Sequence, residues 1–253
     1  MLRTRVIPCL LLQNSGLVKT VKFKDPKYVG DPINAVRIFN EKEVDELVFL
    51  DTSATPAGRG PNFELLAAIA SEAFMPFGYG GGITRLDQIK RLYALGVEKV
   101  ILNTAAARTP DLVSEAACIA GSSSVVVSVD VRRGCLGGYT VFTHCGQQDT
   151  RRDPVEYVQE MGRHGAGEIL VNSIDRDGTM AGYDLELIGR VAEAVSVPVV
   201  AVGGAGELNH FRQAVDKGAS AVSAGSLFVF HGKHRAVLIT YPEYARLEKV
   251  FMK

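Results

Sequence analysis

Eight short apolar segments, spread over the whole chain, constrain its fold more than any other feature. Each has the length of a buried β-strand, and amphipathic stretches of helical length, such as residues 86–95 and 154–162, lie between most of them. Strands that alternate with helices indicate a parallel sheet, and eight such units predict a closed α/β barrel, the (β/α)8 or TIM barrel. The predicted strands are residues 5–11, 46–51, 76–80, 99–103, 124–130, 168–173, 198–202 and 221–225.

The composition agrees with a single barrel. A chain of 253 residues, 47% hydrophobic and 22% charged, has the length of one such barrel, typically about 250 residues. No linker-like segment divides it, so we expect one domain over residues 1–253. The 28 basic residues balance 28 acidic ones, which favours neither nucleic acid nor an anionic membrane as a partner. No apolar run approaches the roughly 18 residues of a membrane span, and no signal-peptide cleavage site follows the first residues, so we expect a cytoplasmic protein.

The four cysteines, Cys9, Cys118, Cys135 and Cys145, form no CxxC pair. In a chain without a secretion signal they are expected to be reduced thiols. The spacing of Cys135, His144 and Cys145 fits no common zinc pattern, so we expect a structural or surface role for them, with no metal and no cofactor. These residues belong to an irregular insert, 132–152, in which YTVFT between glycine-rich flanks predicts a β-hairpin.

The two halves of the chain repeat each other at an offset of 122 residues. PFGYGGG at residues 76–82 matches PVVAVGG at 198–204, and Glu46 matches Glu168 at the same offset. A repeat this long is not a solenoid unit and predicts two similar half-barrels. Their expected bounds are about residues 1–122 and 123–253.

Each half also carries a glycine-rich loop suited to a phosphate group. Glycine lets backbone N–H groups approach an anion closely, and the helix that follows each loop favours negative charge at its start. The end of the next strand in each half adds amide and hydroxyl donors. Two such sites predict a long phosphorylated ligand with a phosphate at each end, and tight turns without a ligand are the alternative. The residues are Gly81, Gly82, Asn103 and Thr104 in one half, and Gly203, Gly204, Gly225 and Ser226 in the other.

Several stretches together resemble one family, the cyclase (synthase) subunit of imidazole glycerol phosphate synthase. They are RVIPCL, DELVFLD, GGGI, EKVILNTAA, GAGEIL, SIDRDGT, GYD and GGAG, and the resemblance extends to about residue 230. It implies a barrel of two halves that binds a bisphosphorylated ribonucleotide and closes an imidazole ring. It also implies a glutaminase subunit that docks on the bottom of the barrel and supplies ammonia.

The resemblance implies two catalytic aspartates, at the ends of the first and fifth strands. Asp130 supplies the second, but Leu11 stands at the first position, and the first acidic residue of the chain is Asp25. A leucine transfers no proton, and it disfavours charge beside it. Substrate binding could outlast the lost chemistry. The substrate contacts implied by the resemblance, besides those of the glycine-rich loops, are Lys19, Asp51, Asp177, Gly178 and Thr179.

Charged residues stand at the starts of four predicted strands and match the family's ring around the ammonia entrance. Such charges are usually solvated or paired for stability, which is the alternative. We expect them to pair and to close an ammonia gate, with Glu98 as a contact for the docked partner. The four residues are Arg5, Glu46, Lys99 and Glu168.

The end of the chain, residues 227–245, departs from the family pattern. Its basic cluster of His231, Lys233, His234 and Arg235 is interpreted as a surface or partner site, with solvated charges as the equal alternative.

Three functions remain open from the sequence. The first is an ammonia-conducting subunit that resembles paralogues from bacterial surface-polysaccharide (O-antigen) clusters. A third protein at the top would amidate a nucleotide-linked N-acetyl sugar, and Leu10, Leu11 and Leu12 would form an apolar mouth. The second is a cyclase of histidine biosynthesis that uses Asp130 with Asp51 or Asp177. The third is a non-catalytic phosphate-binding scaffold.

Overall fold

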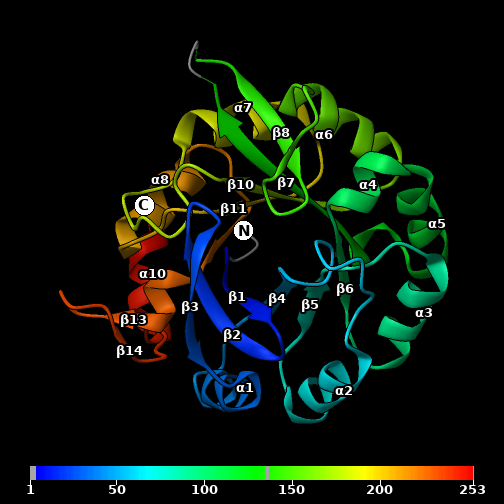
Figure 1. The fold of residues 1–253 in the computed structure, drawn as a ribbon. Coiled ribbons are helices and arrows are strands. Elements are labelled where there is room, and N and C mark those ends of the chain that lie inside the picture. The colour runs from blue at the N-terminus through cyan, green and yellow to red at the C-terminus, as the bar shows by residue number, and fades with distance from the viewer. Residues whose placement is uncertain (1–3, 135–136, 253) are drawn as a thin grey trace.

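Eight parallel strands close into a barrel at the centre of the molecule (Figure 1). A computed structural model describes residues 4–134 and 137–252. Each barrel strand pairs in parallel with the next along the chain, and the last pairs with the first, Arg5 lying opposite Ala221. The predicted (β/α)8 fold is therefore confirmed. The strands are β1 (Arg5–Gln13), β4 (Leu47–Asp51), β5 (Phe77–Gly80), β6 (Lys99–Leu102), β7 (Val125–Arg133), β10 (Glu168–Ser173), β11 (Val199–Val202) and β12 (Ala221–Ala224).

Helices surround the barrel and begin at residues suited to cap them. Asp31, Asn62, Asp153 and Asp184 each precede a helix and accept a hydrogen bond from a backbone N–H of its first turn. The capped starts direct each chain segment back along the outside of the barrel after its strand. The outer helices are α1 (Pro32–Glu41), α2 (Phe63–Glu72), α3 (Leu86–Ala94), α4 (Thr104–Arg108), α5 (Asp111–Ala120), α6 (Pro154–Arg163), α7 (Leu185–Ala194) and α8 (Leu208–Asp216), with the 3-10 turn η1 (Ser122–Ser124).

The strands separate two apolar regions. Because side chains alternate across a strand, one set faces the helices and the other faces the barrel interior. The outer set includes Phe39 and Phe49 and forms the main core. The inner set is smaller and includes Ile7, Val126 and Leu170. The middle of the barrel is therefore a packed apolar layer between its two ends.

Two antiparallel hairpins extend the sheet above the carboxyl ends of the strands. β1 continues into β2 (Gly16–Val21) and β3 (Lys24–Gly30), and β7 continues into β8 (Tyr139–Thr143) and β9 (Gln148–Asp149). The second hairpin confirms the one predicted in the insert 132–152, where residues 135 and 136 lie outside the described residues. The β2–β3 hairpin was not predicted. The division into half-barrels at residue 122 stays a prediction.

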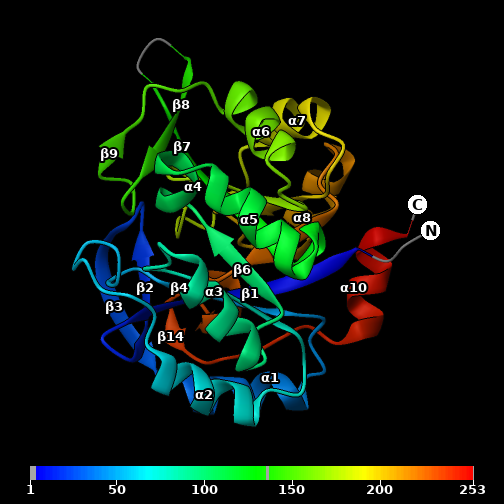
Figure 2. The ribbon, with the colours of Figure 1, turned by 90° about the vertical axis from the view of Figure 1, so that its right-hand side faces the viewer.

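The last segment forms a short hairpin and a helix. α9 (Ser226–Val229) leads to β13 (Phe230–His231) and β14 (Ala236–Val237), which pair with each other, and α10 (Tyr244–Phe251) follows. Figure 2 shows both termini at the amino end of the barrel, opposite the β2–β3 and β8–β9 hairpins. Among the described residues, no helix combines the length and apolar character that crossing a membrane requires.

Candidate functional site

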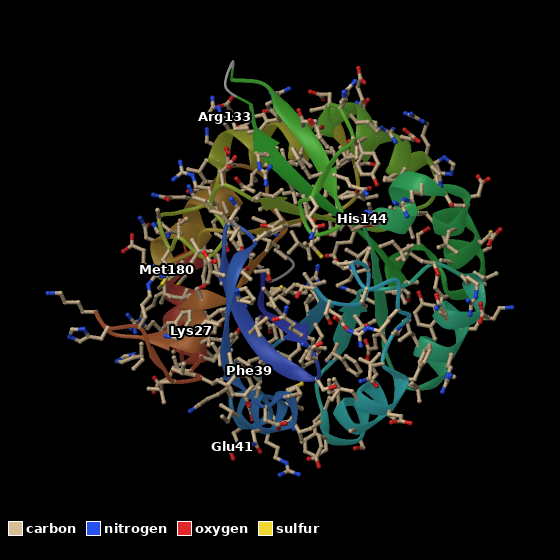
Figure 3. All side chains as sticks on the ribbon, in the orientation of Figure 1. Lys27, Phe39, Glu41, Arg133, His144 and Met180 are labelled. Atoms are coloured by element: carbon tan, nitrogen blue, oxygen red, sulfur yellow. The ribbon has the colours of Figure 1, made fainter. Side chains whose placement is uncertain are left out.

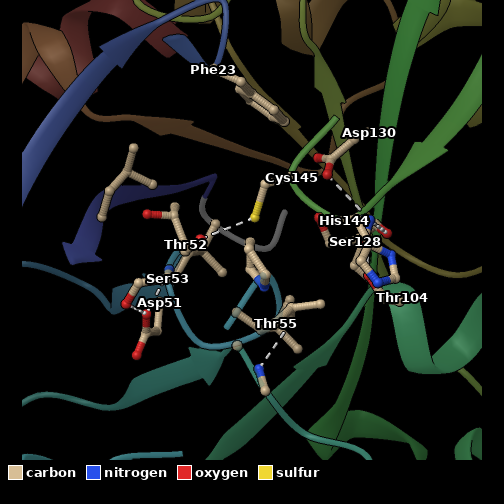
Figure 4. Close-up of a pocket in the computed structure, with 18 of the residues that line it drawn as sticks. Phe23, Asp51, Thr52, Ser53, Thr55, Thr104, Ser128, Asp130, His144 and Cys145 are labelled. Carbon is tan, nitrogen blue, oxygen red and sulfur yellow. Dashed lines mark hydrogen bonds between the residues drawn. The ribbon is translucent and has the colours of Figure 1, made fainter. Parts of the chain in front are cut away.

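A cavity of about 930 Å³ opens at the carboxyl ends of the strands, the end at which barrels of this kind carry their active sites (Figure 4). The structure brings together almost every residue that the sequence predicted for ligand binding. Thr179 is the exception: it does not line the cavity, and its hydroxyl donates to the Arg176 carbonyl at 2.6 Å. The predicted residues in the lining are Lys19, Asp51, Gly81, Gly82, Asn103, Thr104, Asp130, Asp177, Gly178, Gly203, Gly204, Gly225 and Ser226.

Asp130 is a buried carboxyl group near the base of this cavity. It lies near the end of β7, and the Asn103 Nδ2 donates to its Oδ2 at 3.2 Å. Burial raises the pKa of Asp130 to about 7, with a further increase from the nearby Asp177 carboxylate. A carboxyl group with this pKa exchanges a proton near neutral pH, so Asp130 can act as an acid or a base.

Lys19 and Asp177 join the β2–β3 hairpin to the loop that follows β10. The buried Lys19 Nζ donates to the Cys9 carbonyl at 2.6 Å, and burial lowers the pKa of this lysine. Burial raises the pKa of Asp177, and Lys19 opposes that shift. The Thr20 hydroxyl donates to Asp177 Oδ2 at 3.3 Å, and the Lys22 N–H donates to the Asp177 carbonyl at 2.9 Å. The hairpin thus positions a cation and a carboxyl group together beside the cavity.

Leu11 is the only one of the three consecutive leucines that faces the cavity. Leu10 and Leu12 are buried in the outer core, whereas Leu11 packs against the inner cluster and lines the cavity. The expectation that all three form an apolar mouth is therefore wrong, because side chains alternate along β1. Leu11 lies opposite Leu50 on β4, so two leucines face the interior at this level. That a catalytic carboxylate belongs at this position, as the family resemblance implies, stays a prediction.

Asp51 lines the same cavity, but its own turn occupies its carboxylate. Oδ1 accepts from the Ser53 N–H at 2.8 Å, from the Ser53 hydroxyl at 2.7 Å and from the Ala54 N–H at 3.0 Å (Figure 4). Three donors from residues 53 and 54 therefore hold one oxygen of this carboxylate within its own turn. Asp177, in contrast, is close enough to Asp130 to raise its pKa, so it is the carboxyl group we pair with Asp130.

Backbone packing alone requires glycine in the two glycine-rich loops. Gly82 and Gly204 have φ angles of 67° and 113°, and a Cβ would lie 2.3 Å from the Arg59 carbonyl or 2.2 Å from the Gly182 carbonyl. The Gly82 N–H already donates to Thr55 Oγ1 at 3.2 Å. These contacts explain the glycines without a ligand, so phosphate binding stays a prediction. The loops nevertheless flank the cavity from opposite halves of the chain.

The opposite end of the barrel is closed by a ring of alternating charges, which we call the floor ring. Arg5 pairs with both Glu46 and Glu168. Lys99 Nζ pairs with the same two carboxylates, at 3.0 Å from Glu46 and 2.8 Å from Glu168. The side chains of both glutamates are only 6% exposed, while those of Lys99 and Arg5 are 20% and 31% exposed. The four predicted residues therefore lie together and pair completely.

Comparison with known protein families gives a match over most of the chain. A family described as "Histidine biosynthesis protein" matches residues 5–235. The chain belongs to this family. The inferred resemblance to the cyclase subunit of imidazole glycerol phosphate synthase is likewise confirmed, because its relatives carry that subunit's name.

The relatives differ in how much of the chain they match. A protein provisionally named imidazole glycerol phosphate synthase subunit hisF2, from Pseudomonas aeruginosa, is 55% identical over 98% of this chain and 99% of its own length. A provisionally named HisF subunit of Leptospira borgpetersenii is 48% identical over 99% of this chain and 100% of its own. The HisF subunit of Thermobifida fusca is 44% identical over 90% of this chain and 91% of its own.

Sequence reasoning placed His144 and Cys145 in a structural or surface role, but the β8–β9 turn carries both into the cavity wall (Figure 4). The Cys145 thiol donates to the Thr52 carbonyl at 3.3 Å, and burial raises the pKa of Cys145 to about 12. Burial, with the Arg108 guanidinium 3.1 Å away, lowers the pKa of His144. The sequence signal that could have found them is their place directly after YTVFT, the second strand of the predicted hairpin. Cys9, Cys118 and Cys145 are free thiols, and Cys135 lies outside the described residues.

Proposed function

We propose that this chain is the synthase-type subunit of a cytoplasmic glutamine amidotransferase that conducts ammonia rather than consuming it. A glutaminase subunit docks on the floor of the barrel, and ammonia crosses the interior to the cavity. A third protein at the top uses it to amidate a nucleotide-linked N-acetyl sugar, as part of O-antigen synthesis. The observation that carries the proposal is the combination of a fully paired floor ring with Leu11 in the cavity wall, where the family resemblance implies a catalytic acid.

The path between the two ends suits ammonia. Above the floor ring, the interior is lined by apolar side chains that exclude water from a neutral solute such as ammonia. They include Ile7, Val48, Val126 and Leu170. Buried charges as close as those of the ring are stable only when paired, so the resting ring is shut. Lys99 is the member that can open it, because its single ammonium swings on a flexible stem. Arg5, in contrast, is held by both arms of its guanidinium.

The floor also presents an anchor for a docked subunit. Phe74 is 90% exposed in the loop before β5, and its N–H donates to Asn40 Oδ1 at 3.0 Å. Asn40 Nδ2 in turn donates to the Glu72 carbonyl at 2.7 Å. The Arg37 guanidinium donates two hydrogen bonds to the Glu72 carboxylate. An exposed aromatic side chain on a backbone held by hydrogen bonds is a candidate interface hot spot, because aromatic residues are enriched there. Phe74 therefore supports docking on this face, together with the exposed Glu98.

One observation favours a second candidate, the cyclase of histidine biosynthesis. Asp130 has a pKa of about 7, and Asp177 is close enough to influence it, so the cavity holds two coupled carboxyl groups. Such a pair can supply an acid and a base to one reaction. Leu11 argues against this candidate, because no carboxylate faces Asp130 from β1.

Reconstitution separates the two candidates. The chain is purified with a glutaminase subunit and with the amidotransferase encoded nearest to its gene, and glutamine-dependent amidation of a nucleotide-linked N-acetyl sugar is measured. Amidation that requires all three proteins supports the proposal. Turnover of the bisphosphorylated ribonucleotide by the two-protein complex, at a rate ordinary for the family, would assign the cyclase instead.

A further inference from the structure

The β13–β14 hairpin and the strand β3 form one continuous surface beside the cavity mouth, which we call the hairpin surface (Figure 1). Lys27 of β3, labelled in Figure 3, has its Nζ 5.8 Å from the centroid of the Phe230 ring in β13. β3 pairs only with β2 in the described structure, so its other edge offers unpaired backbone groups. Two segments about 200 residues apart in the sequence, from two separate sheets, therefore lie side by side, and β3 contributes a free strand edge.

Basic side chains outnumber acidic ones on this surface, and Asp25 of β3 is its single acidic residue. His231, Lys233, His234 and Arg235 are all exposed, and no acidic residue occurs between residues 231 and 242. Within the described residues none of these four side chains forms an ion pair with a carboxylate. The whole chain carries as many acidic as basic residues, so this concentration is local. Lys233 and Arg235 are the cations of this group, and cations without a paired carboxylate attract an acidic partner.

Apolar side chains stand among these cations. Tyr28 of β3 is 67% exposed, and Val237 and Leu238 at the end of the hairpin are 45% and 54% exposed. The backbone of the hairpin is nevertheless held in place, since the Leu238 N–H donates to the Val229 carbonyl at 2.9 Å. Ordered apolar groups inside a charged rim are the usual composition of a protein–protein interface.

The hairpin surface is also connected to the cavity. Arg235 Nη2 donates to the Thr179 carbonyl at 3.5 Å, on the loop whose Asp177 and Gly178 line the cavity. β3 is paired with β2, which carries Lys19 into the same cavity. A protein bound to the hairpin surface would therefore sit at the cavity mouth and could receive what leaves it.

We infer that the hairpin surface binds the ammonia-accepting protein through an acidic patch on that protein. The inference rests on the proposed function, because the occupant is the protein that uses the ammonia. Charge complementarity requires negative charge on the partner's contact surface. The contact of Arg235 with the cavity loop places the bound partner at the cavity mouth. The free edge of β3 provides further main-chain hydrogen bonds for a strand of the partner.

The test measures binding of the purified amidotransferase encoded nearest to this gene, in the presence of the glutaminase subunit. Charge reversal in the double variant Lys233→Glu and Arg235→Glu should raise the Kd at least tenfold, and added salt should weaken the wild-type complex. Lys90→Glu, an exposed reversal on α3, is the matched control and should leave the Kd unchanged. Glutamine hydrolysis with the glutaminase subunit should be unaffected in all variants, since the hairpin surface lies away from the floor.

The outcomes separate this inference from the proposed function. If the amidotransferase binds and amidation proceeds, but the double variant binds as tightly as wild type, the hairpin surface is overturned and the proposed function stands. If the amidotransferase does not bind the wild type at all, both are overturned. A third outcome is that vesicles of anionic phospholipid bind the wild type but not the double variant, while the amidotransferase binds both equally. The hairpin surface would then face a membrane, and the inference would be wrong.

Discussion

Lys99 Nζ lies 2.8 Å from Glu168 Oε2 in the floor of the barrel, and the same ammonium lies 3.0 Å from Glu46 Oε2. The Lys99→Ala variant should leave glutaminase binding and glutamine hydrolysis nearly intact. It should uncouple hydrolysis from amidation, because an opening remains where the ammonium closed the ring. The measurement is the ratio of glutamate formed to acceptor amidated, with Lys90→Ala as the control. An unchanged ratio would mean that ammonia takes another route.

Leu11 should make the chain a poor cyclase. With the bisphosphorylated ribonucleotide and an ammonium salt, we expect a rate about 10²–10⁴-fold below that of ordinary family members, the usual cost of a lost general acid or base. Leu11→Asp should recover part of this activity, since only this one of the three leucines faces the cavity. Leu11→Asn is the control, because an asparagine side chain has nearly the size of an aspartate side chain but does not exchange a proton near neutral pH. Equal recovery by both variants would contradict an acid–base role.

Asp130 should make the protein more stable at acidic pH than at neutral pH. Its folded-state pKa of about 7 exceeds the ordinary aspartate pKa of 3.8, so between these pH values the folded chain holds a proton that the unfolded chain releases. The free energy of unfolding should therefore fall as pH rises from about 4 to 7, by up to about 4 kcal/mol from this group. Asp130→Asn should flatten that slope in urea titrations at several pH values. Asp25→Asn, at an exposed site, is the control and should keep the wild-type slope. If Asp130→Asn also keeps that slope, the buried Asp130 carboxyl group is not the cause of the pH dependence.

Phosphate should occupy both glycine-rich loops. Crystals soaked in phosphate should show one ion near Gly82 and Thr104 and another near Gly204 and Ser226, because each loop joins backbone N–H groups with a hydroxyl at the cavity wall. Thr104→Val removes a hydroxyl from one loop only and should weaken that site while sparing the other. Ordered loops that stay empty at high phosphate would support the alternative of tight turns without a ligand.

Phe74 should anchor the glutaminase subunit. Truncation of a well-placed interface aromatic usually costs more than 1 kcal/mol, so Phe74→Ala should raise the Kd for the glutaminase by about fivefold or more. Tyr28→Ala is the matched control, because Tyr28 is 67% exposed at the other end of the barrel. Isothermal titration of both variants decides the matter. If Phe74→Ala and Tyr28→Ala bind the glutaminase subunit with equal affinity, the docking site does not include Phe74.

Much of the candidate site follows from sequence because of how a barrel is built. The carboxyl ends of its strands converge, so residues such as Asp130 and Gly204 had to meet at one end once the strands were recognised. The starts of the strands converge likewise, which brought Arg5 and Glu168 together. Recognition of β3 failed because its exposed, charged residues lack the apolar alternation of a half-buried strand.

The sequence by itself determined the eight barrel strands, their order and the end of the barrel at which the predicted polar residues lie. Only the tertiary structure decided which way individual side chains face. Leu11 turns inward while Leu10 and Leu12 turn outward, and the Asp51 carboxylate is taken by its own turn. The reason is physical: the side-chain direction in a strand alternates with every residue. Its phase is therefore set by pairing with neighbouring strands, which lie far away in the sequence.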